Sequence, residues 1–143
     1  MMKIYFAASI RGGRNDVAHY AQFITLLKNF GEVLTEHIAD PHLTPHGESH
    51  LTDVQIHDRD MDWLLSADVV IAEVTTPSLG VGYEIGRAVE NNIPVVCFYR
   101  KQGDRRLSAM IAGNKTITVI EYNQVQELPK ILDNLPQLDN RAV

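Results

Sequence analysis

The sequence predicts an α/β fold: a single-domain, doubly wound, five-stranded parallel sheet of the Rossmann-like or flavodoxin-like kind, with helices on both faces. Three observations predict it. Short apolar runs alternate along the chain with segments of helical periodicity, the runs are uninterrupted rather than alternating, and most are followed by polar or glycine-rich segments. Uninterrupted apolar strands separated by amphipathic helices indicate a parallel sheet that is covered on both faces. The domain is expected to span residues 1–143, with residues 139–143 as a loose tail.

The first half of the chain supplies two expected strands and two helices. Residues 3–8 form an apolar run that ends in a Ser-Ile-Arg-Gly-Gly turn. Residues 16–30 carry apolar side chains at helical spacing, and Gly31 follows as a stop. Residues 33–36 could form a short strand, and residues 53–66 have the apolar content of a second helix.

The second half repeats the alternation. Expected strands cover residues 68–73, 94–99 and 116–122, and expected helices cover residues 81–92, 105–112 and 124–135. In a doubly wound sheet, ligands bind at the carboxyl ends of the strands. The segments expected at that edge are residues 9–14, 73–82 and 100–108.

Composition narrows the range of functions. Hydrophobic residues make up 45% and charged residues 22% of the 143, which is typical of a soluble globular protein. The net charge of −5 argues against a broad surface for a nucleic acid polymer, but it permits a small anionic ligand. We expect no membrane association and a cytoplasmic location, with the nucleus as a second possibility. Cys97 is the single cysteine, and its apolar surroundings predict a buried core thiol.

The segment 78–87, Ser-Leu-Gly-Val-Gly-Tyr-Glu-Ile-Gly-Arg, is the most informative part of the sequence. It follows an apolar strand and opens a helix, and its glycines would allow a ligand to approach the backbone. Glu84 could orient a hydroxyl-rich ligand or attack an electrophilic carbon. The alternative is that Glu84 is a first-turn glutamate favoured by the helix dipole, with glycines needed only for tight strand–helix packing.

The turn after the first strand, residues 9–14, is a second candidate. Free N–H groups and the helix dipole favour an anion there, Ser9 adds a donor, and Arg11 can contact two phosphate oxygens. The glycine spacing matches neither the dinucleotide fingerprint nor the phosphate loop of nucleotide triphosphatases, and plain loop geometry is the alternative. The serine, the arginine and the position together favour a phosphate site.

Three further features carry weaker signals. Asp58, Asp60 and Asp62 are spaced by two on a helix, so at most one or two of them can face a site. The basic run at residues 100–106 is either a solvated loop or a source of positive potential for a phosphate. Residues 39–52 contain His42, His46 and His50, but Pro45 and Gly47 argue against a helical metal site, and we expect a mobile loop there.

These residues together resemble a known family. Ile4-Tyr5-Phe6 with the turn 9–14, the segments 34–37, 67–75 and 77–86, and Leu107–Ile111 are similar to the 2′-deoxynucleoside 5′-monophosphate N-glycosidases of the nucleoside 2-deoxyribosyltransferase family. The resemblance covers nearly the whole chain in order, and it is weakest at residues 39–52 and in the C-terminal tail.

The resemblance implies a hydrolase that releases the base from deoxynucleoside monophosphates, with no cofactor or metal. It places the nucleophile at Glu84, a second carboxylate at Asp60 and a tuning hydroxyl at Tyr5. It also implies a homodimer in which Ser108 reaches the neighbouring subunit's site. The implied substrate-binding residues are Ala8, Ser9, Ile10, Arg11, Gly12, Gly13, Arg14, Ser78, Gly80, Ser108, Ala109 and Met110.

Three alternatives remain open from the sequence. A deoxyribosyltransferase would form the same covalent intermediate but pass the sugar to a second base. A cytidine monophosphate hydrolase would accept ribose. A non-catalytic nucleotide sensor would have no need for a nucleophile paired with Asp60 and Tyr5.

Overall fold

Five parallel strands form the centre of the protein in a computed structural model, which describes residues 1–10, 16–40, 42, 48 and 50–139. The strands are β1 (Lys3–Ala8), β2 (Glu32–Val33), β3 (Val69–Glu73), β4 (Val95–Tyr99) and β5 (Ile117–Glu121). They are arranged in the order β2-β1-β3-β4-β5, and every pairing is parallel. This is the flavodoxin-like order of a doubly wound sheet, so the predicted fold class is confirmed.

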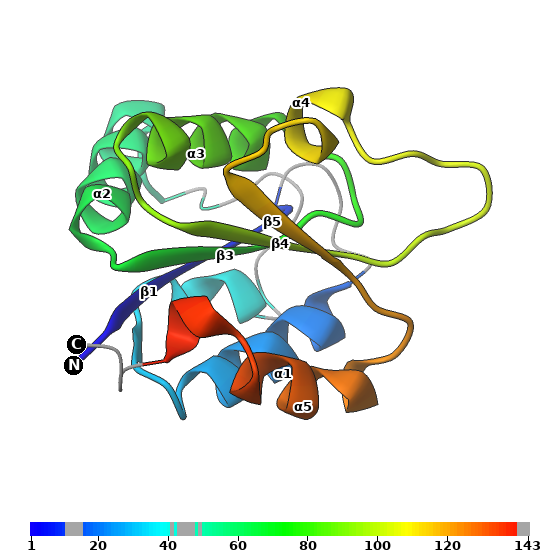
Figure 1. The fold of residues 1–143 in the computed structure, drawn as a ribbon. Coiled ribbons are helices and arrows are strands. Elements are labelled where there is room, and N and C mark those ends of the chain that lie inside the picture. The colour runs from blue at the N-terminus through cyan, green and yellow to red at the C-terminus, as the bar shows by residue number, and fades with distance from the viewer. Residues whose placement is uncertain (11–15, 41, 43–47, 49, 140–143) are drawn as a thin grey trace.

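Helices cover both faces of the sheet (Figure 1). Helices α1 (Val17–Leu27) and α5 (Leu128–Asp133) lie on one face, and α2 (Asp53–Ser66), α3 (Leu79–Glu90) and the short α4 (Ala109–Ala112) lie on the other. Three single turns of 3₁₀ helix complete the described elements, η1 (Glu36–Ala39), η2 (Val125–Glu127) and η3 (Pro136–Leu138). Two separate hydrophobic clusters therefore hold the layers together.

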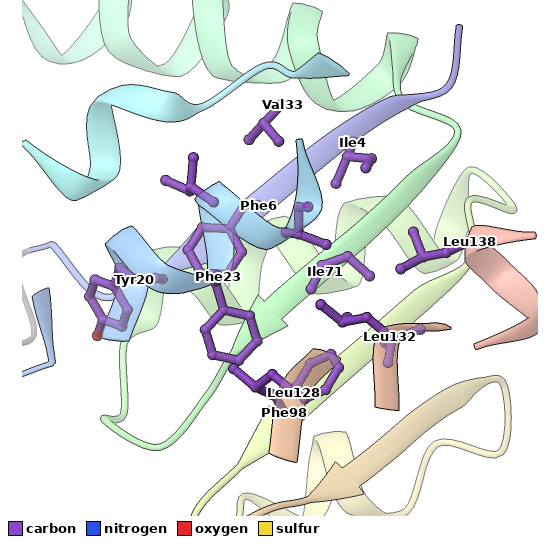
Figure 2. Close-up of a cluster of buried hydrophobic side chains, with 14 of the residues drawn as sticks. Ile4, Phe6, Tyr20, Phe23, Val33, Ile71, Phe98, Leu128, Leu132 and Leu138 are labelled. Atoms are coloured by element: carbon purple, nitrogen blue, oxygen red, sulfur yellow. The ribbon is translucent and has the colours of Figure 1, made fainter. Parts of the chain in front are cut away.

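The alternation of side chains along β1 decides which residues can reach the functional face. Ile4 and Phe6 point into the cluster beneath α1 and α5, where Phe6 stacks on Phe23 at a centroid distance of 5.4 Å (Figure 2). Tyr5 and Ala7 point the opposite way, into the cluster beneath α2 and α3. The pleat of the strand thus places the Tyr5 side chain on the face where α2 and α3 pack.

Several element boundaries differ from those predicted. The helix expected at 16–30 ends at Leu27, and Gly31 stands where a Cβ would lie 2.3 Å from the carbonyl oxygen of Met2. The strand expected at 33–36 is only Glu32–Val33, and the helix expected at 124–135 divides into η2 and α5.

Side-chain caps explain two more differences. Helix α3 begins at Leu79 rather than at residue 81 because the Ser78 side chain accepts a hydrogen bond from the Val81 N–H at 3.3 Å. Only the last turn of the predicted helix 105–112 forms, because Ser108 caps α4 by accepting from the Met110 N–H.

The predicted core thiol is confirmed, since Cys97 is fully buried in β4. Burial raises the pKa of this thiol to about 12, and the nearby Glu73 charge acts in the same direction. Among the helices described, none combines the length and the apolar character needed to span a bilayer.

Candidate active site

A cavity of about 540 Å³ opens at the carboxyl end of β1, between α2 and α3. The edge of the sheet predicted to bind a ligand is therefore hollowed, as expected for a doubly wound fold. The cavity is lined by Ala8, Ile10, Glu48, Asp53, Ile56, His57, Asp60, Pro77, Ser78, Leu79, Gly80, Val81 and Glu84.

Tyr5 and Glu84 form the polar centre of this cavity. The Tyr5 hydroxyl donates a short hydrogen bond to Glu84 Oε2, across 79 positions of sequence. Tyr5 is 1% exposed, whereas Glu84 is partly exposed and faces the cavity. Strand β1 thus fixes the position of a carboxylate carried by α3.

The environment of Glu84 favours its protonated form more than water does. Burial raises the pKa of Glu84 to about 7, the Tyr5 hydrogen bond opposes that shift, and the negative charge of Asp60 adds to it. Burial and the two carboxylates hold the Tyr5 pKa far above its usual range. Tyr5 is therefore a permanent neutral donor, and Glu84 changes its charge near neutral pH.

Asp60 reaches the same cavity from α2. Its Oδ1 accepts from Arg59 Nε at 3.0 Å and from Arg59 Nη2 at 2.9 Å. Burial raises the pKa of Asp60 and the Arg59 charge partly counteracts this, so the net direction is upward. Two carboxylates with raised pKa values therefore face one cavity, which is typical of acid–base sites.

Glu84 is not in the first turn of its helix. Helix α3 begins at Leu79, so Glu84 is its sixth residue, beyond the reach of the dipole at the N-terminus. Gly82 and Gly86 do not serve tight packing against the described part of the chain either, since a Cβ at each would meet none of its atoms within 4 Å. The alternative interpretation, that Glu84 is a first-turn glutamate favoured by the helix dipole and that the glycines serve only tight packing, is therefore wrong.

The predicted substrate-binding residues divide into three groups. Ala8, Ile10, Ser78 and Gly80 line the Glu84 cavity, while Ser9 is fully buried and its Oγ has no hydrogen-bond partner in the described part of the chain. Arg11, Gly12, Gly13 and Arg14 lie outside the described residues. Ser108 and Met110 line a different cavity, and Ala109 is exposed at the start of α4.

That second cavity, of about 640 Å³, lies on the other side of the N-terminal turn of α3. The two cavities share Pro77, Ser78, Leu79 and Val81. Arg105 and Arg106 from the predicted basic run also line the second one. Ser108 therefore does not line the Glu84 cavity of its own chain.

The model of the family described as nucleoside 2-deoxyribosyltransferase matches residues 4–128. The chain belongs to this family. A human protein named 5-hydroxymethyl-dUMP N-hydrolase is 53% identical over 140 residues, covering 95% of this chain and 80% of that protein. A Tetraodon nigroviridis protein of the same name is 49% identical over 138 residues, covering 93% and 96%.

A solved structure shows the same fold at much lower sequence similarity. The CMP N-glycosidase from Clostridium botulinum superposes with a TM-score of 0.66 at 20% identity, covering 92% of this chain and 98% of that one. At this identity the likeness supports the fold alone.

In this nucleoside 2-deoxyribosyltransferase family member, the sequence interpretation missed the partners of Asp60. Arg59 contacts both Asp60 and Glu48, and Glu48 Oε1 lies 3.1 Å from His37 Nε2. His57 also lines the cavity, and its Nε2 lies 3.0 Å from the Tyr83 hydroxyl. An arginine next to Asp60 was the only sequence signal for the first contact.

The aspartates on α2 behave as their spacing predicts. Asp60 alone of the three lines the cavity, and Asp58 and Asp62 are exposed. Of the loop histidines, His42 and His50 are exposed, and His46 lies outside the described residues. Within the described ranges, no group of three or more His, Cys, Asp or Glu side chains is arranged to hold a metal ion.

A buried polar network lies behind the site, and the sequence analysis did not predict it. Glu73, at the end of β3 and 1% exposed, accepts from the Tyr122 hydroxyl and from Thr75 N at 2.7 Å. Arg100 Nη2 donates to Asp16 Oδ1 at 2.7 Å, and Arg100 N donates to Thr75 Oγ1. This network ties the start of α1 to the ends of β3 and β4.

Proposed function

We propose that this chain hydrolyses the N-glycosidic bond of 2′-deoxynucleoside 5′-monophosphates to a free base and 2-deoxyribose 5-phosphate. Its membership of the nucleoside 2-deoxyribosyltransferase family and its identity of about 50% to proteins named 5-hydroxymethyl-dUMP N-hydrolase support this activity. The observation that carries the proposal is the Glu84 carboxylate, held by Tyr5 in a cavity that Asp60 also lines.

In the first half-reaction, the ionised Glu84 attacks the anomeric carbon of the sugar. The bond from that carbon to the base nitrogen breaks, its electron pair leaves with the base, and protonated Asp60 donates a proton to the base. A glycosyl ester on Glu84 results, as in a retaining glycosidase. The positive charge that develops on the sugar is stabilised by the carboxylate before the bond forms.

In the second half-reaction, a water molecule replaces the enzyme on the sugar. The Asp60 carboxylate accepts a proton from this water. The water oxygen bonds to the anomeric carbon, and the bond from that carbon to Glu84 breaks. Asp60 and Glu84 return to their starting protonation states, with 2-deoxyribose 5-phosphate as the product. The raised pKa of Asp60 suits it to both proton transfers.

The phosphate is proposed to lie at the N-terminal turn of α3, whose Ser78, Leu79 and Gly80 line the cavity. Free backbone N–H groups and the helix dipole favour an anion at this position. Ser9 and Arg11 are proposed to complete the phosphate site from the preceding turn. Binding energy from the phosphate would then position the anomeric carbon over Glu84.

The working unit is proposed to be a homodimer in which Ser108 completes the partner's phosphate site. Leu79 is 97% exposed and Met110 is 82% exposed, and both lie beside the second cavity. The outward Gly82 and Gly86 would allow close approach of a second chain. A two-fold interface would use this patch twice.

The activity is tested by chromatography of free base after incubation with a panel of nucleotides. The panel contains deoxynucleoside 5′-monophosphates including 5-hydroxymethyl-dUMP, the ribonucleoside 5′-monophosphates, and deoxynucleosides without phosphate. Base release from the deoxynucleoside monophosphates alone supports the proposal. Transfer of the sugar to an added second base, or equal cleavage of CMP, would replace it with another family activity. Binding without release would favour a nucleotide sensor.

A further inference from the structure

Arg59 connects the carboxylate Asp60 to a second carboxylate that has no role in the steps above. Its Nη1 and Nη2 donate to the two oxygens of Glu48 at 2.8 and 2.7 Å, and its Nε and Nη2 donate to Asp60 Oδ1. The guanidinium also lies 4.7 Å from the ring centroid of Trp63. These contacts fix the orientation of the Arg59 guanidinium, because this planar group can donate to two carboxylates only in one plane.

We propose that Arg59 is a positioning residue that acts through Asp60. Together with the opposing charge of Glu48, it sets the fraction of Asp60 that carries a proton. That fraction sets the relative rates of the two half-reactions, because the first needs protonated Asp60 and the second needs ionised Asp60. The inference rests on the proposed function. It assigns Arg59 and Glu48 a role in the chemistry through Asp60 and not through contact with the reacting atoms.

The charges around Asp60 give the two residues opposite effects. The Arg59 guanidinium lowers the pKa of the Asp60 carboxyl, whereas the Glu48 charge raises it. Among the described residues, the other ionisable groups that act on this pair are Tyr5 from β1, His37 from η1, His50, and Glu84 from α3, and Asp53 and His57 of α2 line the same cavity.

Removing one member of the pair therefore moves the titration of Asp60 in the direction opposite to removing the other. In Arg59→Gln the positive charge is lost and the Asp60 pKa rises. In Glu48→Gln the guanidinium keeps its charge but loses its main counter-charge, so the Asp60 pKa falls. A purely structural role would give two variants that are impaired in the same way.

The first experiment measures the pH dependence of kcat/KM for base release in both variants. Base release needs an ionised Glu84 and a protonated Asp60, so the pH profile is bell-shaped and the ionisation of Asp60 sets one of its two limbs. The expected shift is about one pH unit upward in Arg59→Gln and downward in Glu48→Gln. Lys28→Gln is the matched control, since Lys28 is an exposed cation paired with Glu36 on the opposite face of the sheet. It should leave the limb in place.

The second experiment separates the half-reactions. With less ionised Asp60 to activate water, Arg59→Gln should release a burst of base and then turn over slowly. Its kcat near neutral pH should fall about 10-fold, while kcat/KM changes by less than about 3-fold. Equal losses in kcat and kcat/KM, or shifts of the same sign in the two variants, would overturn the inference.

The titration of the Asp60 carboxyl, followed by ¹³C NMR, keeps the inference testable without turnover. Opposite shifts in Arg59→Gln and Glu48→Gln support the charge balance, and unchanged titration in both contradicts it. If the parent chain released no base from any nucleotide, the proposed function would fail. Opposite NMR shifts in the two variants would still show that Arg59 and Glu48 have opposing effects on the titration of Asp60. If the parent chain is active and neither variant shifts its limb, the role of Arg59 alone fails.

Discussion

The Tyr5 hydroxyl donates a hydrogen bond to Glu84 Oε2, so a tyrosine in β1 holds a carboxylate carried by α3. The bond stabilises the ionised carboxylate against the cost of burial, which otherwise raises its pKa. Since only the ionised form can attack the sugar, this contact couples the sheet to the reactivity of the proposed nucleophile.

Removing the tyrosine hydroxyl should therefore shift the acid limb of the pH profile. With Glu84 titrating at a pKa of about 7, kcat/KM for base release should rise as pH increases through 7. Tyr5→Phe removes a bond that lowers this pKa, so the limb should move upward by about one pH unit. Tyr83→Phe is the control, because that hydroxyl contacts His57 and Arg87 instead of Glu84. An unmoved limb in Tyr5→Phe would contradict the assignment.

Glu84 should also weaken the fold as it ionises. Its folded pKa of about 7 exceeds the ordinary value of 4.5, so between those pH values the folded chain holds a proton that the unfolded chain has released. Stability from this group therefore falls as pH rises from about 4.5 to 7. The free energy of unfolding of Glu84→Gln should exceed that of the parent by about 1–3 kcal/mol at pH 8, and the two should differ little at pH 4.

Urea denaturation at the two pH values measures this difference. Glu36→Gln serves as the control, because Glu36 is an exposed glutamate paired with Lys28, and its replacement should not raise the free energy of unfolding at pH 8. A Glu84→Gln chain that keeps the parent's pH slope would show that burial of Glu84 carries no cost.

The Glu73–Tyr122 contact should be important for stability. Glu73 is 1% exposed, and burial raises its pKa while the hydrogen bonds from Tyr122 and Thr75 oppose that shift. Tyr122→Phe leaves this carboxylate without one donor and should cost about 1–3 kcal/mol in urea denaturation. Tyr99→Phe loses a bond to the Arg105 carbonyl oxygen and should cost less. Equal costs would mean that the buried carboxylate does not depend on Tyr122.

The proposed dimer predicts complementation between two inactive chains. In a mixture of Glu84→Ala with Ser108→Trp, a heterodimer would place both changes in one site and leave the other intact. An equal mixture should recover about a quarter of the parent activity after exchange of subunits. If Ser108 serves its own chain, every site keeps one change and mixing restores nothing. A fully active monomer at assay concentration would also refute the proposal.

The sheet was predictable because its strands are short, apolar and separated by helical periodicity. Strands β1, β3 and β4 are buried along almost their whole length, and their sequences are uninterrupted apolar runs. Helix ends were less predictable, because α3 and α4 begin where Ser78 and Ser108 accept backbone N–H groups. The presence of a serine in a polar turn does not predict which backbone N–H its side chain will accept.

The residues at the centre of the cavity could be predicted from the sequence, but the contacts between their side chains could not. Family resemblance pointed to Tyr5, Asp60 and Glu84, and the structure brings Tyr5 into contact with Glu84 from 79 positions away. Glu48 could not be found in the same way. Its contact with Arg59 joins residues 11 positions apart in the chain, and it is set by tertiary packing.

The central claim is that Glu84 forms a covalent bond to the sugar. The most direct measurement quenches Asp60→Asn during reaction with a deoxynucleoside 5′-monophosphate and maps the modified peptide by mass spectrometry. Asp60→Asn loses both the acid of the first half-reaction and the base of the second, so the substrate chosen is one whose base leaves without being protonated. Only the water step then depends on Asp60, so the glycosyl ester accumulates. The account predicts a 2-deoxyribose 5-phosphate adduct on the peptide that contains Glu84, and none in Glu84→Gln. Base release by Glu84→Gln at the parent's rate, or an adduct on any other residue, would contradict it.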